Sequence, residues 1–89
     1  MTKTSDQPWF VYLLQCADGS LYTGITTNLN RRLQEHNSQS SKAARYTRAR
    51  QPVSLAYHEP AKNRSEASKR EYEIKRMTKN KKLGLIAHR

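Results

Sequence analysis

The order of hydrophobic and polar positions in this chain predicts strands first and helices after them. Residues 9–14 form a continuous run of aromatic and branched apolar side chains, which is typical of a strand covered on both faces. Residues 21–25 predict a second strand. Asp18-Gly19 lies between the runs and predicts a tight turn, because glycine adopts positive φ without steric cost. The two runs therefore predict an antiparallel hairpin.

A helix is predicted over about residues 28–38. Thr26-Thr27-Asn28 offers N-cap candidates, and Leu29 and Leu33 recur after one helical turn and mark the buried side. His36 falls close to this apolar stripe on a helical wheel.

The same wheel separates two neighbouring arginines. Arg32 lies on the shoulder of the apolar stripe, whereas Arg31 points well away from it. We therefore expect Arg32 to reach a site next to the core and Arg31 to face solvent.

The middle of the chain is a polar segment followed by a segment in which apolar and polar side chains alternate. Residues 38–51 predict a basic loop that Pro52 ends. The period of residues 53–58 is typical of a half-exposed strand, and Pro60 predicts its end. The apolar side of this strand would consist of Val53, Leu55 and Tyr57.

Asn63-x-x-Glu66 resembles a capping box and predicts a helix that continues to about Thr78. Its buried side would consist of Ala67, Ile74 and Met77. Residues 83–87 predict a short closing helix. The element order is then β-β-α-β-α with a possible last helix, which is the order of a small α+β protein.

Length and composition limit the size of the fold. The chain has 89 residues with 35% hydrophobic side chains, enough for one domain with a small core. We expect a flexible lead-in over residues 1–8 and a single domain over 9–89. The one cysteine, Cys16, excludes a disulfide within the chain and suits a small, half-buried filler.

The charge points to a polyanionic partner. Seventeen Lys and Arg stand against seven Asp and Glu, for a formal net charge of +10, which favours nucleic-acid binding over mere solubility. A membrane surface is a weaker option because no lipidation motif accompanies the charge. No apolar run is long enough for a membrane span and no signal-peptide pattern is present, so we expect a cytoplasmic protein.

Five side chains together suggest a chemistry. Tyr12, Tyr22, Arg32, His36 and Glu71 offer two phenols, a fixed cation, an imidazole and a carboxylate. A metal-assisted site that cleaves phosphodiesters needs about this set. Taken singly, each has an ordinary interpretation as a core tyrosine, a surface arginine, a packed histidine or a helix-surface glutamate.

Periodicity does not single out one carboxylate. Glu66 and Glu73 border the apolar stripe of their helix about as closely as Glu71, and Glu71 would ordinarily pair with Lys75 at the i,i+4 spacing. The residues alone therefore predict a basic α+β domain with a candidate site and no named reaction.

In their order and spacing, several motifs resemble the GIY-YIG nuclease domain. These motifs are Phe10-Val11-Tyr12, Tyr22-Thr23-Gly24, Arg32, His36 and Glu71. The resemblance runs from about Trp9 to Asn80. The stretches Tyr-Thr-Gly-Ile-Thr-Thr at 22–27 and Arg-Ser-Glu-Ala-x-x-x-Glu-Tyr-x-Ile-Lys at 64–75 are similar to the small stand-alone bacterial members, the YhbQ-like or Uri-type proteins.

The resemblance implies a three-stranded antiparallel sheet flanked by helices, and roles for five residues. Tyr12 matches the tyrosine of the first family motif. Tyr22 matches that of the second, which Gly24 ends. Arg32 matches the helical arginine of the family, and His36 stands where members have a histidine or a tyrosine.

The resemblance also implies a cofactor and a substrate. Glu71, preceded by Ala67 at the usual offset, matches the metal-binding glutamate, which would hold a single Mg²⁺ or Mn²⁺. The reaction would be endonucleolytic cleavage of DNA, on structured or damaged substrates of the kind met in DNA repair. Independently of the resemblance, the charge of one segment predicts that Lys42, Arg45, Arg48 and Arg50 contact the nucleic acid from a flexible basic loop, with solvated charge as the alternative.

Four departures from the family pattern leave other functions open. Phe10 replaces a glycine, Thr23 replaces an isoleucine, and Ile25 stands where repair nucleases have a lysine. The asparagine near the end of some family domains has no counterpart. The alternative function is a nucleic-acid-binding module on a nuclease-like scaffold with weak or no catalysis. A third is an RNA-binding or ribosome-associated protein.

The hairpin register offers a geometric test. A two-residue turn at Asp18-Gly19 would pair Tyr12 with Ile25 and put Tyr12 and Tyr22 on opposite faces of the sheet. We therefore predict an odd-length loop, or a bulge of the same parity, that brings both phenols to one face.

Overall fold

A computed structural model describes residues 7–38 and 41–87 of the chain. Residues 1–6 of the expected lead-in, and residues 39–40 and 88–89, lie outside this part. The elements, in order, are β1 (Trp9–Gln15), β2 (Leu21–Thr26), α1 (Leu29–His36), α2 (Arg45–Arg48), β3 (Ser54–Ala61), α3 (Arg64–Lys75) and α4 (Lys79–Ala87).

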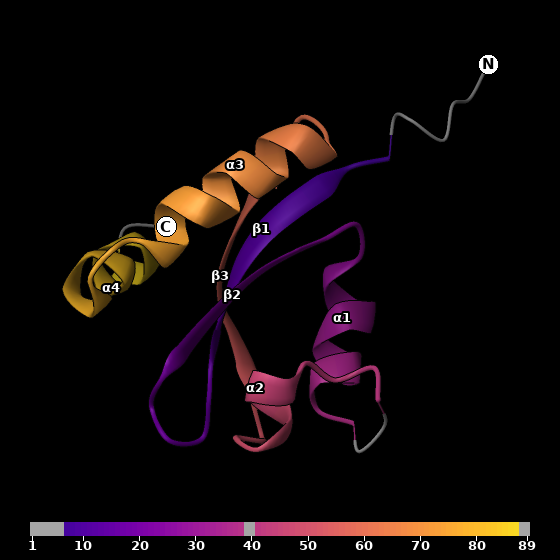
Figure 1. Ribbon diagram of the computed structural model, residues 1–89, viewed down its shortest axis with the longest axis vertical. Helices are drawn as coiled ribbons and strands as arrows, with labels where there is room; N and C mark the ends of the chain where they lie inside the picture. The colour runs from indigo at the N-terminus through magenta and orange to yellow at the C-terminus, as the bar shows by residue number, and fades with distance from the viewer. Residues whose placement is uncertain (1–6, 39–40, 88–89) are drawn as a thin grey trace.

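The three strands form one antiparallel sheet in the order β2-β1-β3, with helices on both of its faces. Figure 1 shows α3 and α4 on one side of the sheet and α1 and α2 on the other. The predicted α+β class and the three-stranded sheet flanked by helices are therefore confirmed. The apolar run of β1 is explained by its central position, since both of its faces are covered.

The side chains of β1 alternate between two cores. Val11 and Leu13 are fully buried under α3 together with Ala67 and Ile74. Tyr12 and Leu14, on the other face, belong to a second cluster of apolar side chains. The members of this second cluster are Tyr12, Leu14, Cys16, Val53, Tyr22, Leu29, Leu33 and Leu55.

The hairpin has the predicted odd loop. Tyr12 pairs with Gly24 and Leu14 pairs with Tyr22, so the two tyrosines project from one face. The backbone N–H of Cys16 donates to the carbonyl of Ser20 at 2.9 Å, which leaves a loop of the three residues between them. Gly19 in this loop has φ +85°, a conformation that a three-residue hairpin loop requires and glycine adopts freely.

The predicted face of the third strand is wrong. The β1–β3 register shifts between Leu13, which pairs with Tyr57, and Leu14, which pairs with Leu55. Ala56 is therefore an extra, bulged residue. The bulge sends Tyr57 to the α3 side and Leu55 to the α1 side, although simple alternation had placed them together.

Further features differ from the prediction, and one of them is the end of α3 at Lys75 instead of about Thr78. Pro60 lies inside β3, opposite Phe10, and does not end the strand. An edge strand tolerates proline because one row of its N–H groups has no strand partner. The basic segment expected as a loop contains the short helix α2, which the burial of Ala43 and Thr47 anchors.

The starts of α1 and α3 agree with the sequence, whereas α4 begins at Lys79, before the predicted residue 83. The side chain of Asn28 accepts a hydrogen bond from the N–H of Arg31, and that of Asn63 accepts one from the N–H of Glu66 at 2.9 Å. Each bond satisfies an N–H that the helix itself leaves free. No helix among the described residues is long and apolar enough to cross a membrane.

One buried polar atom predicts a stabilising substitution. The hydroxyl of Thr23 is buried on the α3 side and has no hydrogen-bond partner among the described residues. Thr23→Val keeps the shape and removes the unpaired group, so we expect it to raise the free energy of unfolding by about 1–2 kcal/mol. Urea denaturation of both proteins measures this. An equal or lower midpoint for the valine variant would show that the hydroxyl is satisfied in solution.

Candidate active site

The centre of the site is a hydrogen bond between β1 and the end of α1. The hydroxyl of Tyr12 lies 2.8 Å from Nε2 of His36. Tyr12 is 2% exposed and His36 is fully buried. The helical wheel had placed His36 next to the apolar stripe, and the structure brings the imidazole under the sheet against the phenol.

A hydrogen-bond chain fixes the direction of this bond. The hydroxyl of Thr47 donates to the carbonyl of Ala44 at 3.1 Å. The Thr47 oxygen also lies 2.7 Å from Nδ1 of His36. Because a hydroxyl has one proton to donate, Thr47 must accept from Nδ1–H. Nε2 of the neutral ring is then an acceptor, and Tyr12 donates its phenol proton to it.

The imidazole is neutral at ordinary pH. Burial, and after it the positive charge of Arg32, lower the pKa of His36 from 6.5 to about 4. A neutral ring agrees with the hydrogen-bond chain, because only a neutral imidazole has the acceptor nitrogen that Tyr12 needs.

Several charges act on the Tyr12 phenol. Burial raises the pKa of Tyr12 to about 12. The guanidinium of Arg32 opposes this rise, whereas Tyr22 and Glu71 add to it electrostatically. The other four predicted site residues therefore all act on the Tyr12 phenol: His36 through a hydrogen bond, and Arg32, Tyr22 and Glu71 through their charges.

Arg32 lies where the wheel placed it. Its side chain is 26% exposed, against 56% for Arg31. Nη1 of Arg32 donates to Oε1 of Glu35 and to the carbonyl of Lys42, both at 2.8 Å. Burial lowers the pKa of Arg32, but its bonds to Glu35 and Tyr12 outweigh burial, and the net pKa lies above the usual value. A permanently charged guanidinium thus lies next to the Tyr12 phenol.

Tyr22 is part of a row of packed side chains, in which it meets His36 edge-to-face and stacks on Tyr46. Its ring centroid lies 5.2 Å from that of His36 and 5.8 Å from that of Tyr46. The guanidinium carbon of Arg50 lies 3.9 Å from the Tyr46 centroid, and Nε of Arg50 lies 3.0 Å from Oδ2 of Asp18. The row runs from the histidine to the hairpin loop and holds the Tyr22 ring in place.

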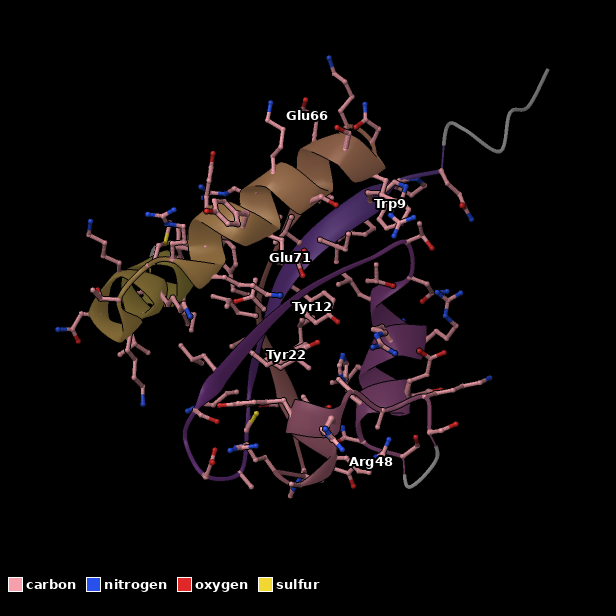
Figure 2. All side chains as sticks on the ribbon, viewed as in Figure 1. Trp9, Tyr12, Tyr22, Arg48, Glu66 and Glu71 are labelled. Atoms are coloured by element: carbon pink, nitrogen blue, oxygen red, sulfur yellow. The ribbon has the colours of Figure 1, made fainter. Side chains whose placement is uncertain are left out.

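Glu71 reaches the site from the helix on the other side of the sheet. Figure 2 shows Glu71 close to Tyr12 and Tyr22, while Glu66 points away from the sheet at the start of α3. The Glu71 side chain is 23% exposed, against 53% for Glu66 and 59% for Glu73. The structure therefore distinguishes Glu71 from the two carboxylates that periodicity could not exclude. Its Oε2 also lies 3.3 Å from Nζ of Lys75, the pair expected on ordinary grounds.

The donor set suits one hard cation. The described residues contain no group of three or more His, Cys, Asp or Glu side chains that could hold a metal ion. A single carboxylate can hold Mg²⁺ or Mn²⁺, because Mg²⁺ keeps most of its waters and takes substrate phosphate oxygens as further ligands. Glu71, partly exposed and next to the phenol, fits this mode.

Gly24 has a steric reason to be glycine. It lies opposite Tyr12 in the β1–β2 register. A Cβ at position 24 would lie 2.6 Å from Cζ of Tyr12 and collide with the phenol oxygen. The absence of a side chain thus lets β2 pass over the phenol.

The predicted nucleic-acid contacts have different environments. Arg45 and Arg48 are exposed on α2. Arg48 donates to the carbonyl of Ala43 at 3.3 Å. Arg50 is paired with Asp18, so part of its charge is neutralised. Part of the predicted loop is the helix α2, which corrects the prediction, while the role of the segment in binding stays a prediction.

Sequence reasoning missed Thr47 and Tyr46. Both lie in the segment read as a loop, yet one orients the imidazole and the other supports Tyr22. The available signal was the i,i+4 spacing of Ala43 and Thr47, which puts two small side chains on one face of a short helix.

The buried imidazole predicts a pH dependence of stability. Below about pH 6.5 the unfolded chain binds a proton at position 36, whereas the folded protein does not until about pH 4. The neutral His36 therefore contributes its full share of the free energy of unfolding above pH 6.5. This contribution is lost as the pH falls from 6.5 to 4, by roughly 3 kcal/mol at the lower end. Urea denaturation at several pH values measures it.

The control for this dependence is His36→Phe, which has no group to titrate at that position. Its stability should fall less steeply between pH 6.5 and 4 than that of the wild type, whatever its absolute value. Equal slopes in the two proteins would mean that His36 is not buried and neutral.

The chain is similar to known proteins over most of its length. The family profile described as the GIY-YIG catalytic domain matches residues 8–83. The chain is 61% identical over 83 residues to a UPF0213 protein of Desulfotalea psychrophila, covering 92% of this chain and 74% of the relative. It is 51% identical over 80 residues to a UPF0213 protein of Staphylococcus aureus, covering 90% and 95%.

A solved structure is also similar. The solution NMR structure of the UPF0213 protein BH0048 from Bacillus halodurans is 41% identical in sequence and has a TM-score of 0.56. The similarity covers 90% of this chain and 83% of that one.

Proposed function

Because the chain belongs to the GIY-YIG family of nuclease domains, we propose that it is a divalent-metal-dependent endonuclease. Its substrate is DNA with branches, nicks or damage, in which it hydrolyses a phosphodiester bond. The family supports nuclease activity in general, and the site residues supply the reasons for the finer statement.

One observation supports the proposal most strongly, namely the environment of the Tyr12 phenol. The phenol donates to a neutral imidazole 2.8 Å away, and it interacts with Arg32 and with the Glu71 carboxylate. A structural tyrosine needs only one partner for its hydroxyl. An acceptor, a fixed cation and a carboxylate that could hold a metal ion, all around one phenol, are the parts of a hydrolytic site.

The proposed proton path starts at a water molecule next to the phenol. The water oxygen attacks phosphorus as one water proton passes to the Tyr12 oxygen. The Tyr12 proton passes in turn to Nε2 of His36, and the leaving oxygen takes a proton from solvent. His36 thus holds the transferred proton, and Tyr12 relays it.

Substrate makes this transfer more favourable. In the free protein the pKa of Tyr12 is raised to about 12 and that of His36 is lowered to about 4, so the proton stays on the phenol. A DNA phosphate at Arg32 would neutralise the charge that helps to depress the His36 pKa. The phosphate therefore raises the basicity of His36 when substrate is in place.

Arg32 and Glu71 act on the phosphate. The guanidinium of Arg32 can take two phosphate oxygens in a fork that lysine cannot copy. Glu71 would hold the divalent cation, which stabilises charge on the phosphate and lowers the pKa of nearby water. Arg45 and Arg48 are the exposed cations of α2 that we propose as contacts to the DNA backbone.

The test is incubation of pure protein with branched, nicked, single-stranded and plain duplex DNA, and with RNA, in Mg²⁺, in Mn²⁺ and in EDTA. We expect cleavage of branched or nicked DNA in either metal and none in EDTA. Binding without cleavage in every lane would establish the alternative, a binding module on a nuclease scaffold.

The hydrogen-bond chain gives a prediction of its own. Thr47→Val removes the acceptor for Nδ1–H of His36 and is expected to lower the cleavage rate about 10- to 100-fold, the size typical of losing an orienting partner. Thr47→Ser should restore most of the rate. Nitrogen-15 NMR of the histidine ring measures the cause directly, with a protonated Nδ1 in the wild type. A protonated Nε2 there would contradict the proposed direction of the Tyr12 bond.

A further inference from the structure

Most of the positive charge lies away from the basic segment that the sequence singled out. Residues 62–89 contain ten Lys and Arg against three Glu, or +7 of the net +10. The described part of this segment consists mainly of α3 and α4, which cover one side of the sheet (Figure 1). The largest source of attraction for a polyanion is therefore this side of the molecule.

One face of α3 combines this charge with an exposed aromatic ring. Ala67 and Ile74 are fully buried and define the inner face. Lys69, Tyr72 and Arg76 follow at spacings of three and four residues on the opposite face. The Lys69 side chain is 70% exposed and Tyr72 is 61% exposed, which is a large exposure for an aromatic residue.

The Tyr72 ring is held in place although it is exposed. Nη1 of Arg76 donates to the Tyr72 hydroxyl at 2.8 Å, and the guanidinium carbon lies 5.3 Å from the ring centroid. Next to the ring is a shallow hollow that Ser68, Lys69, Tyr72 and Glu73 line. A fixed ring beside cations and an open hollow is the arrangement on which unpaired bases stack.

This face continues from the candidate active site. Lys75 is the neighbour of Glu71 around the circumference of α3, on the side away from the core. Its Nζ lies 3.3 Å from the Glu71 carboxylate. Tyr72 follows on the same flank by helical geometry. A strand that leaves the site past Glu71 would therefore meet Lys75 and then the Tyr72 ring.

We propose that this face of α3 binds a single-stranded segment of the nucleic-acid substrate. Tyr72 stacks an unpaired base, and Lys69 and Arg76 contact the phosphates on either side of it. Glu73 opposes binding, and its charge is offset in part by Arg70, which lies 3.1 Å from Glu73 and 2.8 Å from Glu59. The inference rests on the proposed function for the substrate and narrows it to DNA with a single-stranded part, such as a flap or a junction.

The test is fluorescence anisotropy with two labelled probes, an oligothymidine of about 12 nucleotides and a duplex of the same length, in EDTA so that neither is cleaved. Tyr72→Ala should weaken binding of the single strand about 5- to 100-fold, since one stacked base contributes in that range. Binding of the duplex should change little, because its bases are already stacked. Tyr72→Phe keeps a ring and should bind both probes like the wild type.

A direct readout of stacking is the fluorescence of Tyr72→Trp. Its added emission should be quenched by the single strand and not by the duplex. Unchanged affinity of Tyr72→Ala for the single strand, or equal losses for both probes, would overturn the proposal. The same experiments distinguish this proposal from the proposed function. If Tyr72→Ala cleaves at the wild-type rate and binds the single strand as the wild type does, the nuclease activity stands and the single-strand site on α3 is wrong. If the wild type binds the single strand selectively through Tyr72 but cleaves no substrate, the single-strand site stands and the nuclease activity is wrong.

Discussion

Tyr12→Phe is expected to cleave DNA about 10²- to 10⁴-fold more slowly than the wild type, the range that general acid–base groups contribute. The substitution removes one oxygen and leaves the ring that fills the second core. It deletes the donor to Nε2 of His36 and with it the proposed proton path. Single-turnover rates at saturating protein measure the chemical step, and anisotropy in EDTA measures binding, which we expect to be unchanged.

Tyr22→Phe is the matched comparison. The Tyr22 ring packs edge-to-face against His36 and stacks on Tyr46, and phenylalanine preserves both contacts. Its hydroxyl makes no hydrogen bond to another described residue, so we expect a smaller loss of rate than for Tyr12→Phe. The reverse order, with Tyr22→Phe inactive and Tyr12→Phe active, would make Tyr22 the phenol that transfers the proton.

Glu71→Gln is expected to reduce metal-dependent cleavage by about 10³-fold or more, because a bound cation contributes several kcal/mol to stabilising the transition state. The amide keeps the size of the side chain and loses the charge that would hold the cation. Stability should fall by less than about 1 kcal/mol, because among the described residues the substitution removes just the surface ion pair with Lys75. DNA affinity in EDTA should not decrease, because the substitution removes a negative charge.

The controls for Glu71 lie on the same helix. Glu66 and Glu73 are more exposed and pair with Lys69 and Arg70. Glu66→Gln and Glu73→Gln should cleave at close to the wild-type rate. If either control loses as much cleavage rate as Glu71→Gln, Glu71 is not the specific metal ligand. The metal would then be held elsewhere on α3, or only the total charge of the helix would affect the rate.

The sheet shows how far the sequence predicts this fold. The apolar run of β1 indicated a central strand, and the need to bring Tyr12 and Tyr22 together predicted the odd hairpin loop. The bulge at Ala56 was not predictable, because one inserted residue leaves no mark on a short alternating pattern and is chosen by packing on both faces. The prediction that Pro60 ends the strand was wrong for a related reason. Whether proline ends a strand depends on whether that strand lies at the edge of the sheet, which the sequence does not show.

The candidate site, too, was predictable from the sequence in part. Helical geometry alone separated Arg32 from Arg31, since burial follows the wheel. Choosing Glu71 over its neighbours needed the family resemblance, because the deciding fact is which flank of α3 lies beside β2. The role of Thr47 was out of reach, because it depends on a contact between residues eleven positions apart and on the direction of one hydroxyl proton.

The most direct test of the central claim is the single-turnover cleavage of one branched DNA by the wild type and by Glu71→Gln, each in Mg²⁺ and in EDTA. The claim is that the residues around Tyr12 form a nuclease site that uses a cation on Glu71. It predicts cleavage only by the wild type in Mg²⁺, with all four mixtures binding the DNA. Cleavage by both proteins at one rate, or by neither protein in any metal on any of the substrates above, would contradict it.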